Sequence, residues 1–360
     1  MRVLMIGAGS PPPTFIQRQV DGLRDIGVEI DFLPPIRRYL GIRQRLLQHG
    51  FVFQLPRDVS VRVEQADLLH FQWPGHWLIY RNLARKYHKK SVLSLRGRQI
   101  NVQPYLPGYE EYARDLTLHL PECDAYHCVS YEMLRQAEAF GMPPARARVI
   151  YTAVDPFFFV PCAEPIPSSP LRIVMTGALI WRKGYEYALL GFRRALDQGL
   201  DAHLTIVGDG AERPRVEYTL QDLGLDKHVT LTGMLGNGSV RDLLQRSHVF
   251  LHAALSEGLP NGLIEAMSCG LPVVATAAGG TAEAVTDGVQ GFIVPTRQPE
   301  AIGDALLHLG HDSDLRTQMG QAGRQKVLQA FNLQDQAQQF RSFYEWVLLG
   351  TPLSAEEAIS

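Results

Sequence analysis

Residues 256–276 carry backbone and side-chain groups suited to binding a phosphorylated ligand. Asn261 is a residue type typical of a helix N-cap, and the residues after it predict a short helix. In a parallel α/β domain such a helix begins at the carboxyl edge of the sheet, with unpaired N–H groups and the positive end of its dipole directed outward. We therefore predict an anion site at the N–H groups of Gly262, Leu263 and Ile264.

Two carboxylates, Glu257 and Glu265, flank this predicted anion site. Because a carboxylate repels phosphate, both side chains are expected to face neutral hydroxyl groups beside it. An ionised carboxylate accepts two charge-assisted hydrogen bonds from a vicinal diol. Diols on both sides of a diphosphate describe a nucleoside-diphosphate sugar, with ribose on one side and a hexose on the other. The alternative is a capping acid and a surface acid without a ligand.

Two cationic side chains, Arg182 and Lys183, follow a predicted strand over residues 171–176. Since the carboxyl ends of parallel strands share one edge of a sheet, both are expected to reach the diphosphate and to stabilise charge that develops as the sugar departs. The alternative is a solvated surface loop. Met234 and Leu235 end a further strand at this edge and offer an apolar surface on which a nucleobase could stack.

The first predicted strand runs into a glycine loop, Gly7-Ala8-Gly9. A dinucleotide fingerprint requires a third glycine where this chain has Pro12, and proline removes a backbone donor, so a nicotinamide cofactor is disfavoured even though Asp31 ends the second strand. We predict that the loop lets backbone at Gly9 approach the donor. The alternative is a turn that needs glycine only for its own conformation.

The elements that would position these groups alternate between strand and helix, which predicts parallel sheets covered by helices. Strands are predicted at 2–6, 28–32, 66–71, 91–95, 125–129, 171–176, 203–207, 229–232, 248–252 and 272–275. Helices are predicted at 14–26, 77–88, 109–120, 131–140, 185–198, 212–223, 238–246, 261–269, 281–286, 299–309, 312–330 and 333–348.

The ten residues 161–170 contain four prolines and no periodic apolar pattern, which predicts a linker. The fold class is therefore α/β, with two Rossmann-like domains. Residues 1–160 form the predicted N-terminal domain and 171–332 the predicted C-terminal domain. Residues 333–349 are predicted to form a helix that packs back on the N-terminal domain, before a tail over 350–360.

Composition excludes several classes of protein. The chain has 360 residues, 46% of them hydrophobic, a formal net charge of −2 and no apolar run long enough to span a membrane or to form a signal peptide. The four cysteines form no CxxC pair or zinc spacing, which predicts a reducing compartment, the cytoplasm. The charge balance is too mild for a nucleic-acid partner.

The run Glu-Gly-Leu-Pro-Asn-Gly-Leu-Ile-Glu-Ala-Met-Ser-Cys-Gly-Leu-Pro-Val resembles the E-x7-E element of the family-4 retaining glycosyltransferases of the GT-B fold. The pair Lys183-Gly184, the segment Val207–Gly210 and Gly279-Gly280 before Glu283 are also similar to that family. In the first half, the match is looser and includes the segment Val149–Asp155, which has Thr-Ala-Val-Asp where the family has Asn-Gly-Val-Asp.

The resemblance implies that the two domains face each other across a cleft, with residues 1–160 as the acceptor domain and 171–332 as the donor domain. It also implies roles for individual residues. Lys183 would bind the donor diphosphate, Glu265 the ribose, and Glu257 the transferred sugar near the reacting centre. The loop at Gly9 would close over the donor. The reaction would retain anomeric configuration without an essential metal or other cofactor, by front-face attack in which the leaving phosphate takes the acceptor proton.

The chain departs from the family pattern in two further places. Ala178 stands where the family often has an arginine, and we expect Arg182 to supply the missing guanidinium. Arg96 stands where the family often has a histidine after an N-terminal strand, so Arg96 would contact donor phosphate or an anionic acceptor. His70 is a second acceptor-side candidate, although a lone histidine is more often structural.

The first 160 residues carry 20 Lys and Arg against 15 Asp and Glu. Basic residues gather in two stretches, 36–48 and 80–90, the first mixed with leucines. This pattern predicts peripheral contact of the N-terminal domain with an anionic membrane and a lipid-linked acceptor. The alternative is two solvated basic faces.

The sequence thus predicts a retaining glycosyltransferase that moves a hexosyl unit from a UDP- or GDP-sugar to a hydroxyl of a glycan, a lipid-linked molecule or a small molecule, as in polysaccharide biosynthesis. One alternative is a GT-B nucleotide-sugar epimerase. Another is a nucleotide-sugar-binding module without catalytic activity.

Overall fold

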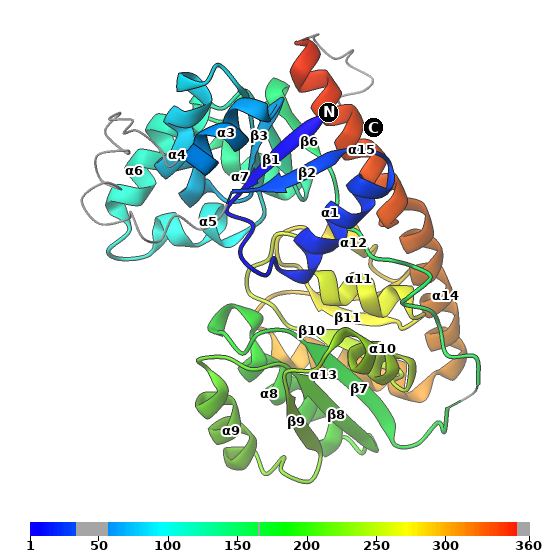
Figure 1. Ribbon diagram of the computed structural model, residues 1–360. Helices are drawn as coiled ribbons and strands as arrows, with labels where there is room; N and C mark the ends of the chain where they lie inside the picture. The colour runs from blue at the N-terminus through cyan, green and yellow to red at the C-terminus, as the bar shows by residue number, and fades with distance from the viewer. Residues whose placement is uncertain (34–56, 165, 351–360) are drawn as a thin grey trace. The chain divides into compact units, whose positions relative to one another are not determined.

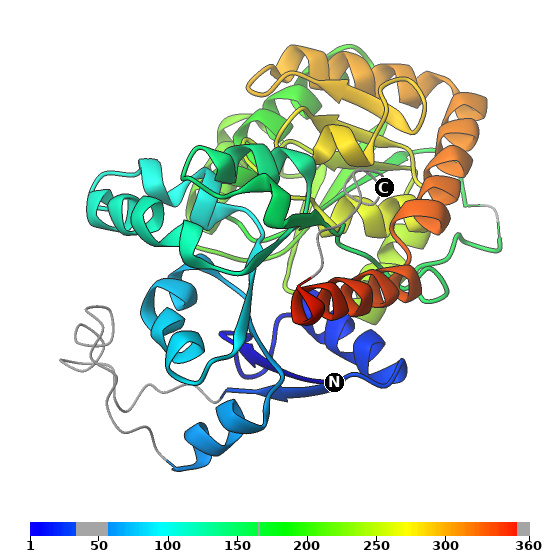
Figure 2. The same ribbon diagram turned by 90° about the horizontal axis from the view of Figure 1, so that it is seen from above.

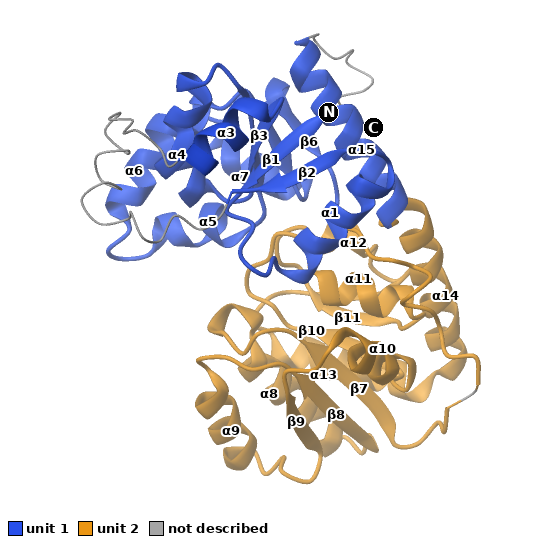
Figure 3. Ribbon diagram, in the orientation of Figure 1, with its two compact units in different colours: residues 1–152, 333–360 blue, residues 153–332 orange. Residues whose placement is uncertain are grey.

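The computed structural model describes residues 1–33, 57–164 and 166–350. The chain divides into two compact units (Figure 3): unit 1 comprises residues 1–152 and 333–360, and unit 2 comprises residues 153–332. Each unit is built on one six-stranded sheet in which the paired strands are parallel (Figure 1). The predicted basic stretch 36–48 lies outside the described residues.

Unit 1 has the strand order β2-β1-β3-β4-β5-β6. Its strands are β1 (Arg2–Ile6), β2 (Glu29–Phe32), β3 (Leu68–Phe71), β4 (Lys90–Leu95), β5 (Ala125–Cys128) and β6 (Ala147–Val149). Its helices are α1 (Thr14–Asp25), α3 (Arg57–Gln65), α4 (Pro74–Lys86), α5 (Arg98–Asn101), α6 (Glu110–His119), α7 (Tyr131–Glu138) and α15 (Leu333–Leu349), with short 3-10 turns at Gln103–Tyr105, Leu120–Glu122 and Pro144–Arg146.

Unit 2 has the strand order β12-β11-β10-β7-β8-β9. Its strands are β7 (Leu171–Thr176), β8 (Ala202–Val207), β9 (Val229–Gly233), β10 (Val249–His252), β11 (Val273–Thr276) and β12 (Gly291–Val294). Its helices are η5 (Trp181–Lys183), α8 (Tyr185–Asp197), α9 (Arg213–Asp222), α10 (Asn237–Gln245), α11 (Asn261–Ser268), α12 (Thr281–Ala284), α13 (Pro299–His311) and α14 (Ser313–Ala330).

The central strands are buried on both faces, as the helices on either side of a parallel sheet require. All four residues of β3, β5, β10 and β11 are buried. Such strands read in sequence as apolar runs rather than as alternating patterns. The structure therefore confirms the α/β class and the repeated strand–helix rhythm.

The C-terminal helix α15 belongs to unit 1 and lies against α1 (Figure 2). Gly22 of α1 allows close approach, because a Cβ there would lie 3.3 Å from the Cβ of Ala337. Phe340, Tyr344 and Val347 join the core of unit 1 from this helix. This packing against unit 1 explains why the helix predicted at 333–348 has an apolar face.

The structure differs from the expected elements in a few places. The chain divides at Thr152, so the predicted linker 161–170 lies within unit 2 and not between the units. The sequence pattern missed α3, the short helix α5 and the short strands β6 and β12. The predicted cap of α11 is wrong: its N-cap is Pro260, Asn261 is the first helical residue, and no side chain caps the helix.

Candidate functional site

The predicted donor-binding residues of unit 2 gather at the carboxyl edge of its sheet. Strands β11, β10 and β7 are neighbours there, so the loops that follow them lie side by side. These loops hold the glycine pair at Gly279, the carboxylate Glu257 and the cations Arg182 and Lys183. Ligands of open α/β sheets bind at this edge.

Glu257 is buried, with 6% of its surface exposed, and is surrounded by basic groups. The Lys183 ammonium donates a hydrogen bond to Oε1 of Glu257. Arg182 Nη1 lies 3.7 Å from Oε2, and His252 Nε2 lies 3.7 Å from Oε1. Arg182 Nη1 also donates to the carbonyl of Ser256 at 3.4 Å. The cluster therefore brings together the residues that the sequence predicted as catalytic, with one histidine that it did not predict.

The electrostatics of the cluster keep Glu257 ionised. Burial by itself would raise the pKa of its carboxyl group, but Lys183, His252 and Arg182 outweigh this and hold the pKa below its usual value. Burial, followed by repulsion from Lys183, lowers the pKa of His252 to about 4, so its imidazole is neutral near pH 7. The cluster thus holds two permanent cations and one carboxylate.

Glycines let the loops of this edge approach one another. Gly279 has φ +55°, and a Cβ there would lie 1.9 Å from the carbonyl oxygen of Glu257. Gly184 has φ +65°, and a Cβ there would lie 2.0 Å from the carbonyl oxygen of Ala253. Neither position tolerates a side chain without backbone movement. Gly279 therefore fixes the position of the Glu257 loop, and Gly184 fixes the position of Lys183, which precedes it in sequence.

The N-terminus of α11 has fewer free donors than the sequence predicted. The N–H of Ile264 donates to the carbonyl of Pro260 at 3.3 Å, so the prediction for Ile264 is wrong. The N–H groups of Gly262 and Leu263 donate no hydrogen bond within the described part of the chain. A Cβ at Gly262 would lie 2.2 Å from Thr176 Oγ1, which places the start of α11 directly against the end of β7.

Other donor-side candidates follow strands or lie on α11 in the same unit. Glu265 is partly exposed on α11, and its charge adds to burial in raising the pKa of the Cys269 thiol. Met234 has 73% of its surface exposed after β9, and Leu235 beside it is partly buried. The exposed Ala178 leaves no guanidinium after β7, and Arg182 lies within the Glu257 cluster. The expectation that Arg182 supplies the missing guanidinium stays a prediction.

In unit 1, Arg96 and the glycine loop lie at the corresponding carboxyl edge. Gly9, with φ +88°, follows β1, and Arg96 follows β4, with β3 between these two strands. Arg96 Nη2 donates to the side-chain oxygens of Gln19 and Gln72 at 2.9 Å each. Its guanidinium lies 5.2 Å from the ring centroid of Phe15.

His70 belongs to a buried hydrogen-bonded chain. Its Nδ1 lies 2.8 Å from Tyr344 Oη and its Nε2 lies 2.8 Å from Ser94 Oγ. Ser94 Oγ lies 2.8 Å from Nδ1 of His127, whose Nε2 donates to the carbonyl of Ile150 at 2.9 Å. Both nitrogens of His70 are therefore occupied, and its acceptor-side role stays a prediction that this geometry does not favour.

The carbonyl of Ile150 fixes the donor and the acceptor of each hydrogen bond in this series of side chains. A carbonyl only accepts, so His127 carries its proton on Nε2 and accepts from the hydroxyl of Ser94. Ser94 then accepts from Nε2–H of His70, whose Nδ1 accepts from the hydroxyl of Tyr344. Burial lowers the pKa of both histidines, with further lowering by Arg96, which agrees with two neutral rings.

Sequence reasoning missed His252, Gln72 and Tyr344. The signal for His252 was available, because it ends a buried apolar strand directly before the Glu257 loop. Gln72 likewise follows β3 at a strand end. Tyr344 gave no signal, because its contact with His70 joins residues 274 positions apart.

Two sequence families match the chain. The family described as Glycosyltransferase Family 4 matches residues 3–157, and Glycosyl transferases group 1 matches residues 161–326. WcaL of Salmonella typhimurium, named as a colanic acid biosynthesis glycosyltransferase, is 27% identical over 262 residues, which are 71% of this chain and 63% of WcaL. N-acetyl-alpha-D-glucosaminyl L-malate synthase of Bacillus anthracis is 23% identical over 79% of this chain and 76% of that enzyme.

Among solved structures, the complex of HepE of Anabaena with UDP-glucose superposes with a TM-score of 0.77 over 96% of this chain and 99% of HepE, at 17% identity. Together with the two parallel six-stranded sheets, this defines a GT-B fold. The two family matches cover most of the chain, and it belongs to the family-4 glycosyltransferases of that fold. The chain spans about six tenths of the length of WcaL.

Proposed function

We propose that the protein is a retaining glycosyltransferase that moves a hexosyl unit from a UDP- or GDP-sugar to a hydroxyl group. One observation carries the proposal: a buried carboxylate, Glu257, is held by Lys183 and Arg182 beside the N-terminus of α11, at the sheet edge where α/β domains bind ligands. Family membership and the UDP-glucose complex of HepE support the donor class.

The cluster explains how a diphosphate and a sugar could be bound together. The ammonium of Lys183 has three donors, so it can bind phosphate oxygen while still contacting Glu257. Arg182 and the N–H groups of Gly262 and Leu263 would bind further phosphate oxygens. Glu257 would accept hydrogen bonds from hydroxyl groups of the transferred sugar, and Glu265 from those of the ribose.

The chemical step would depend on charge stabilisation. As the bond between the anomeric carbon and the phosphate oxygen breaks, negative charge grows on the departing diphosphate, where Lys183 and Arg182 would stabilise it. The acceptor hydroxyl would attack from the face that the phosphate leaves, and the phosphate would take its proton. Because side-chain cations supply this stabilisation, we propose a reaction without an essential metal or other cofactor.

The acceptor proposals follow from the relatives and from charge. The names of two relatives refer to colanic acid biosynthesis and to an L-malate glucosaminide, so a glycan and a small molecule are both within the class we propose, beside a lipid-linked acceptor. No described helix is long and apolar enough to cross a membrane. We propose a cytoplasmic location with peripheral contact to an anionic membrane.

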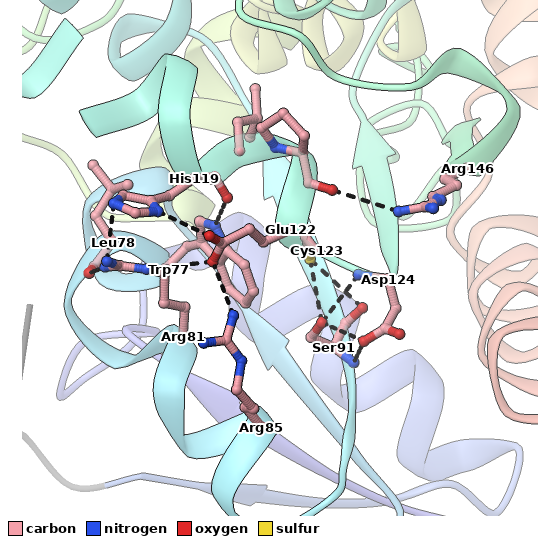
Figure 4. Close-up of polar contacts among 12 residues, drawn as sticks. Trp77, Leu78, Arg81, Arg85, Ser91, His119, Glu122, Cys123, Asp124 and Arg146 are labelled. Atoms are coloured by element: carbon pink, nitrogen blue, oxygen red, sulfur yellow. Dashed lines mark hydrogen bonds and ion pairs between the residues drawn. The ribbon is translucent and has the colours of Figure 1, made fainter. Parts of the chain in front are cut away.

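The basic stretch 80–90 bears on membrane contact (Figure 4). Glu122 lies 3.6 Å from both Arg81 and Arg85. Asp124 lies 3.3 Å from Lys90. The positive charge of this stretch is therefore partly neutralised within unit 1. We expect weak, salt-sensitive binding to anionic vesicles, and equal co-sedimentation with anionic and neutral vesicles would contradict membrane contact.

Nucleotide release from a panel of UDP-, GDP- and ADP-hexoses, with and without EDTA, tests the function. We expect release from a UDP- or GDP-sugar that persists under chelation, and a product with the donor's anomeric configuration by NMR. Glu257→Gln should lower kcat by about 10²-fold or more, whereas Glu300→Gln, which removes an exposed carboxylate from the same unit, should not.

Three outcomes would contradict this proposal. A changed sugar on an intact nucleotide would identify an epimerase, and donor binding without turnover or hydrolysis would identify a binding module. Loss of activity on chelation, restored by a divalent cation, would refute the metal-independent step while leaving the donor class intact.

A further inference from the structure

Arg96 is a charged residue whose partners within the protein are neutral. Its Nη2 donates to the amide oxygens of Gln19 and Gln72, and its guanidinium packs on the ring of Phe15. Its Nε is buried without a partner, and no ion pair joins Arg96 to a carboxylate within the described ranges. These contacts therefore fix the orientation of the Arg96 guanidinium without neutralising its positive charge.

The surroundings of Arg96 do not supply a negative charge. Burial lowers the pKa of its guanidinium to about 10, which still leaves the group charged at neutral pH. The titratable rings that it affects, His70 and His127, are buried and neutral, and Arg96 further lowers their pKa. A partly buried cation is costly unless it is paired, so an anionic ligand at Arg96 would gain more than one at an exposed arginine.

A second polar group at this edge also lacks a partner. Gln72 is fully buried, its oxygen accepts from Arg96, and its Nε2 has no hydrogen-bond partner. Each member of this hydrogen-bonded pair thus has one buried donor without a partner, Nε of Arg96 and Nε2 of Gln72. Buried donors without partners are uncommon in folded proteins and often mark a site that binds a ligand or water.

Aromatic contacts join Arg96 to the glycine loop after β1. Phe15 beneath Arg96 packs edge-on against Trp73, with the ring centroids 6.2 Å apart, and Trp73 Nε1 donates to the carbonyl of Gly7 at 3.0 Å. Arg96 therefore lies at the ligand-binding edge of the sheet of unit 1, among the strand ends of β1, β3 and β4.

We propose that Arg96, positioned by Gln19 and Gln72, binds a carboxylate or phosphate group of the acceptor, so that the protein selects acidic acceptors over neutral ones. This inference rests on the proposed function and deepens it. An arginine matches the planar, two-oxygen geometry of both anions, which a histidine at the same place would not. The donor's diphosphate has its own cations in unit 2, Lys183 and Arg182. The charge of Arg96 is therefore available to a third anionic group.

The test compares acceptors that differ only in charge. The pairs are glycerol 1-phosphate with glycerol, and methyl glucuronoside with methyl glucoside. The binding of each member to the full-length protein, with UDP present, is measured by calorimetry, and transfer from the active nucleotide sugar is measured in parallel. We expect the acidic member of at least one pair to bind tenfold or more tightly than its neutral counterpart.

Variants then assign that preference to Arg96. Arg96→Gln should weaken binding of the preferred acidic member by about tenfold or more, an expectation of about 1.4 kcal/mol, and should remove the discrimination between the two members. Arg96→Lys should retain part of the preference. Arg114→Gln, which removes an exposed charge from the same unit, should change neither. The donor KM should stay within about twofold in all three.

Each outcome is decisive. Equal binding of acidic and neutral members by the wild-type protein would overturn the proposal, and this arm does not depend on a variant that folds. A rise in donor KM without a change for acceptors, in Arg96→Gln, would assign Arg96 to donor phosphate instead. Absence of nucleotide release from every donor would refute the proposed function. The calorimetric binding measurements would still show whether Arg96 binds anions.

Discussion

Acidification should destabilise unit 1 through the buried chain that joins Tyr344, His70, Ser94 and His127. In the folded protein both imidazoles are neutral, because burial lowers their pKa well below 6.5 and each ring already accepts a hydrogen bond on Nδ1. In the unfolded chain each histidine takes up a proton near pH 6.5. The unfolded state therefore binds more protons below that pH, so stability is present above pH 6.5 and is lost as pH falls.

The size of the loss follows from the same pKa difference. Between pH 7.5 and 5.5 each histidine costs about 1.4 kcal/mol of unfolding free energy, provided its folded pKa stays below 5.5, and the pair costs about 3 kcal/mol. Ordinary domains are stable by about 5–15 kcal/mol, so this is a large fraction. The helix that carries Tyr344, α15, should loosen together with β3, β4 and β5, since the chain joins all four elements.

Urea unfolding at pH 7.5, 6.5 and 5.5 gives the global free energy, and amide exchange read on peptides of β4, β5 and α15 separates unit 1 from unit 2. This separation is needed because His252, with a pKa of about 4, contributes a similar loss in unit 2. NMR titration of the histidine ring protons gives the two folded pKa values directly. A folded pKa near 6.5 for either ring, or a loss in unit 1 below about 1 kcal/mol, would refute the reasoning.

Three further predictions concern packing and charge. Lys183→Met should destabilise unit 2 by about 3–5 kcal/mol in urea unfolding, because it leaves Glu257 buried without its nearest cation. The double variant with Glu257→Gln should regain most of the stability but not the activity, and additive losses of stability would contradict the coupling of the two residues. Gly279→Ala should cost about 1–3 kcal/mol and weaken donor binding measured by calorimetry, since its Cβ would collide with the Glu257 carbonyl; unchanged binding would show that the loop does not position Glu257. Tyr344→Phe should cost about 1–3 kcal/mol, because His70 loses the donor to its buried Nδ1; a neutral effect would place water there.

The fold was largely readable from the sequence because most elements carry strong local patterns. The apolar runs of β1, β7 and β10 and the amphipathic spacing of α1, α8 and α15 agree with the structure to within a few residues. The strands that were missed are weakly patterned: β6 has three residues, and β12 begins with glycine. Helix α3 was missed although Val59 and Val63 form a buried apolar face one turn apart. The α11 cap failed for a different reason. Pro260, with φ −80° and ψ 108°, takes the cap position, and the favourable residue type of Asn261 does not override it.

The candidate site was readable in its residue types but not in its pairings. Spacing predicted that Glu257 would face sugar and Lys183 would face phosphate, whereas in the structure the two bind each other. Their contact depends on the pairing of β7 with β10, which brings together loops 74 positions apart. His252 and Gln72 are uncharged polar residues at strand ends, and their importance lies in neighbours that no local pattern specifies.

The cations at the carboxyl edges of the two sheets have different partners: a carboxylate in unit 2 and neutral groups in unit 1. In unit 2 the two cations share a buried carboxylate, so a diphosphate bound as we propose would share Lys183 with Glu257. In unit 1 the cation Arg96 has amide oxygens and an aromatic ring for partners, so an anion binding there displaces no carboxylate. The proposed donor site of unit 2 therefore favours a ligand that offers both phosphate for Lys183 and hydroxyl groups for Glu257. At Arg96 the proposed preference for acidic ligands comes from the charge of the guanidinium, which Gln19, Gln72 and Phe15 hold in place.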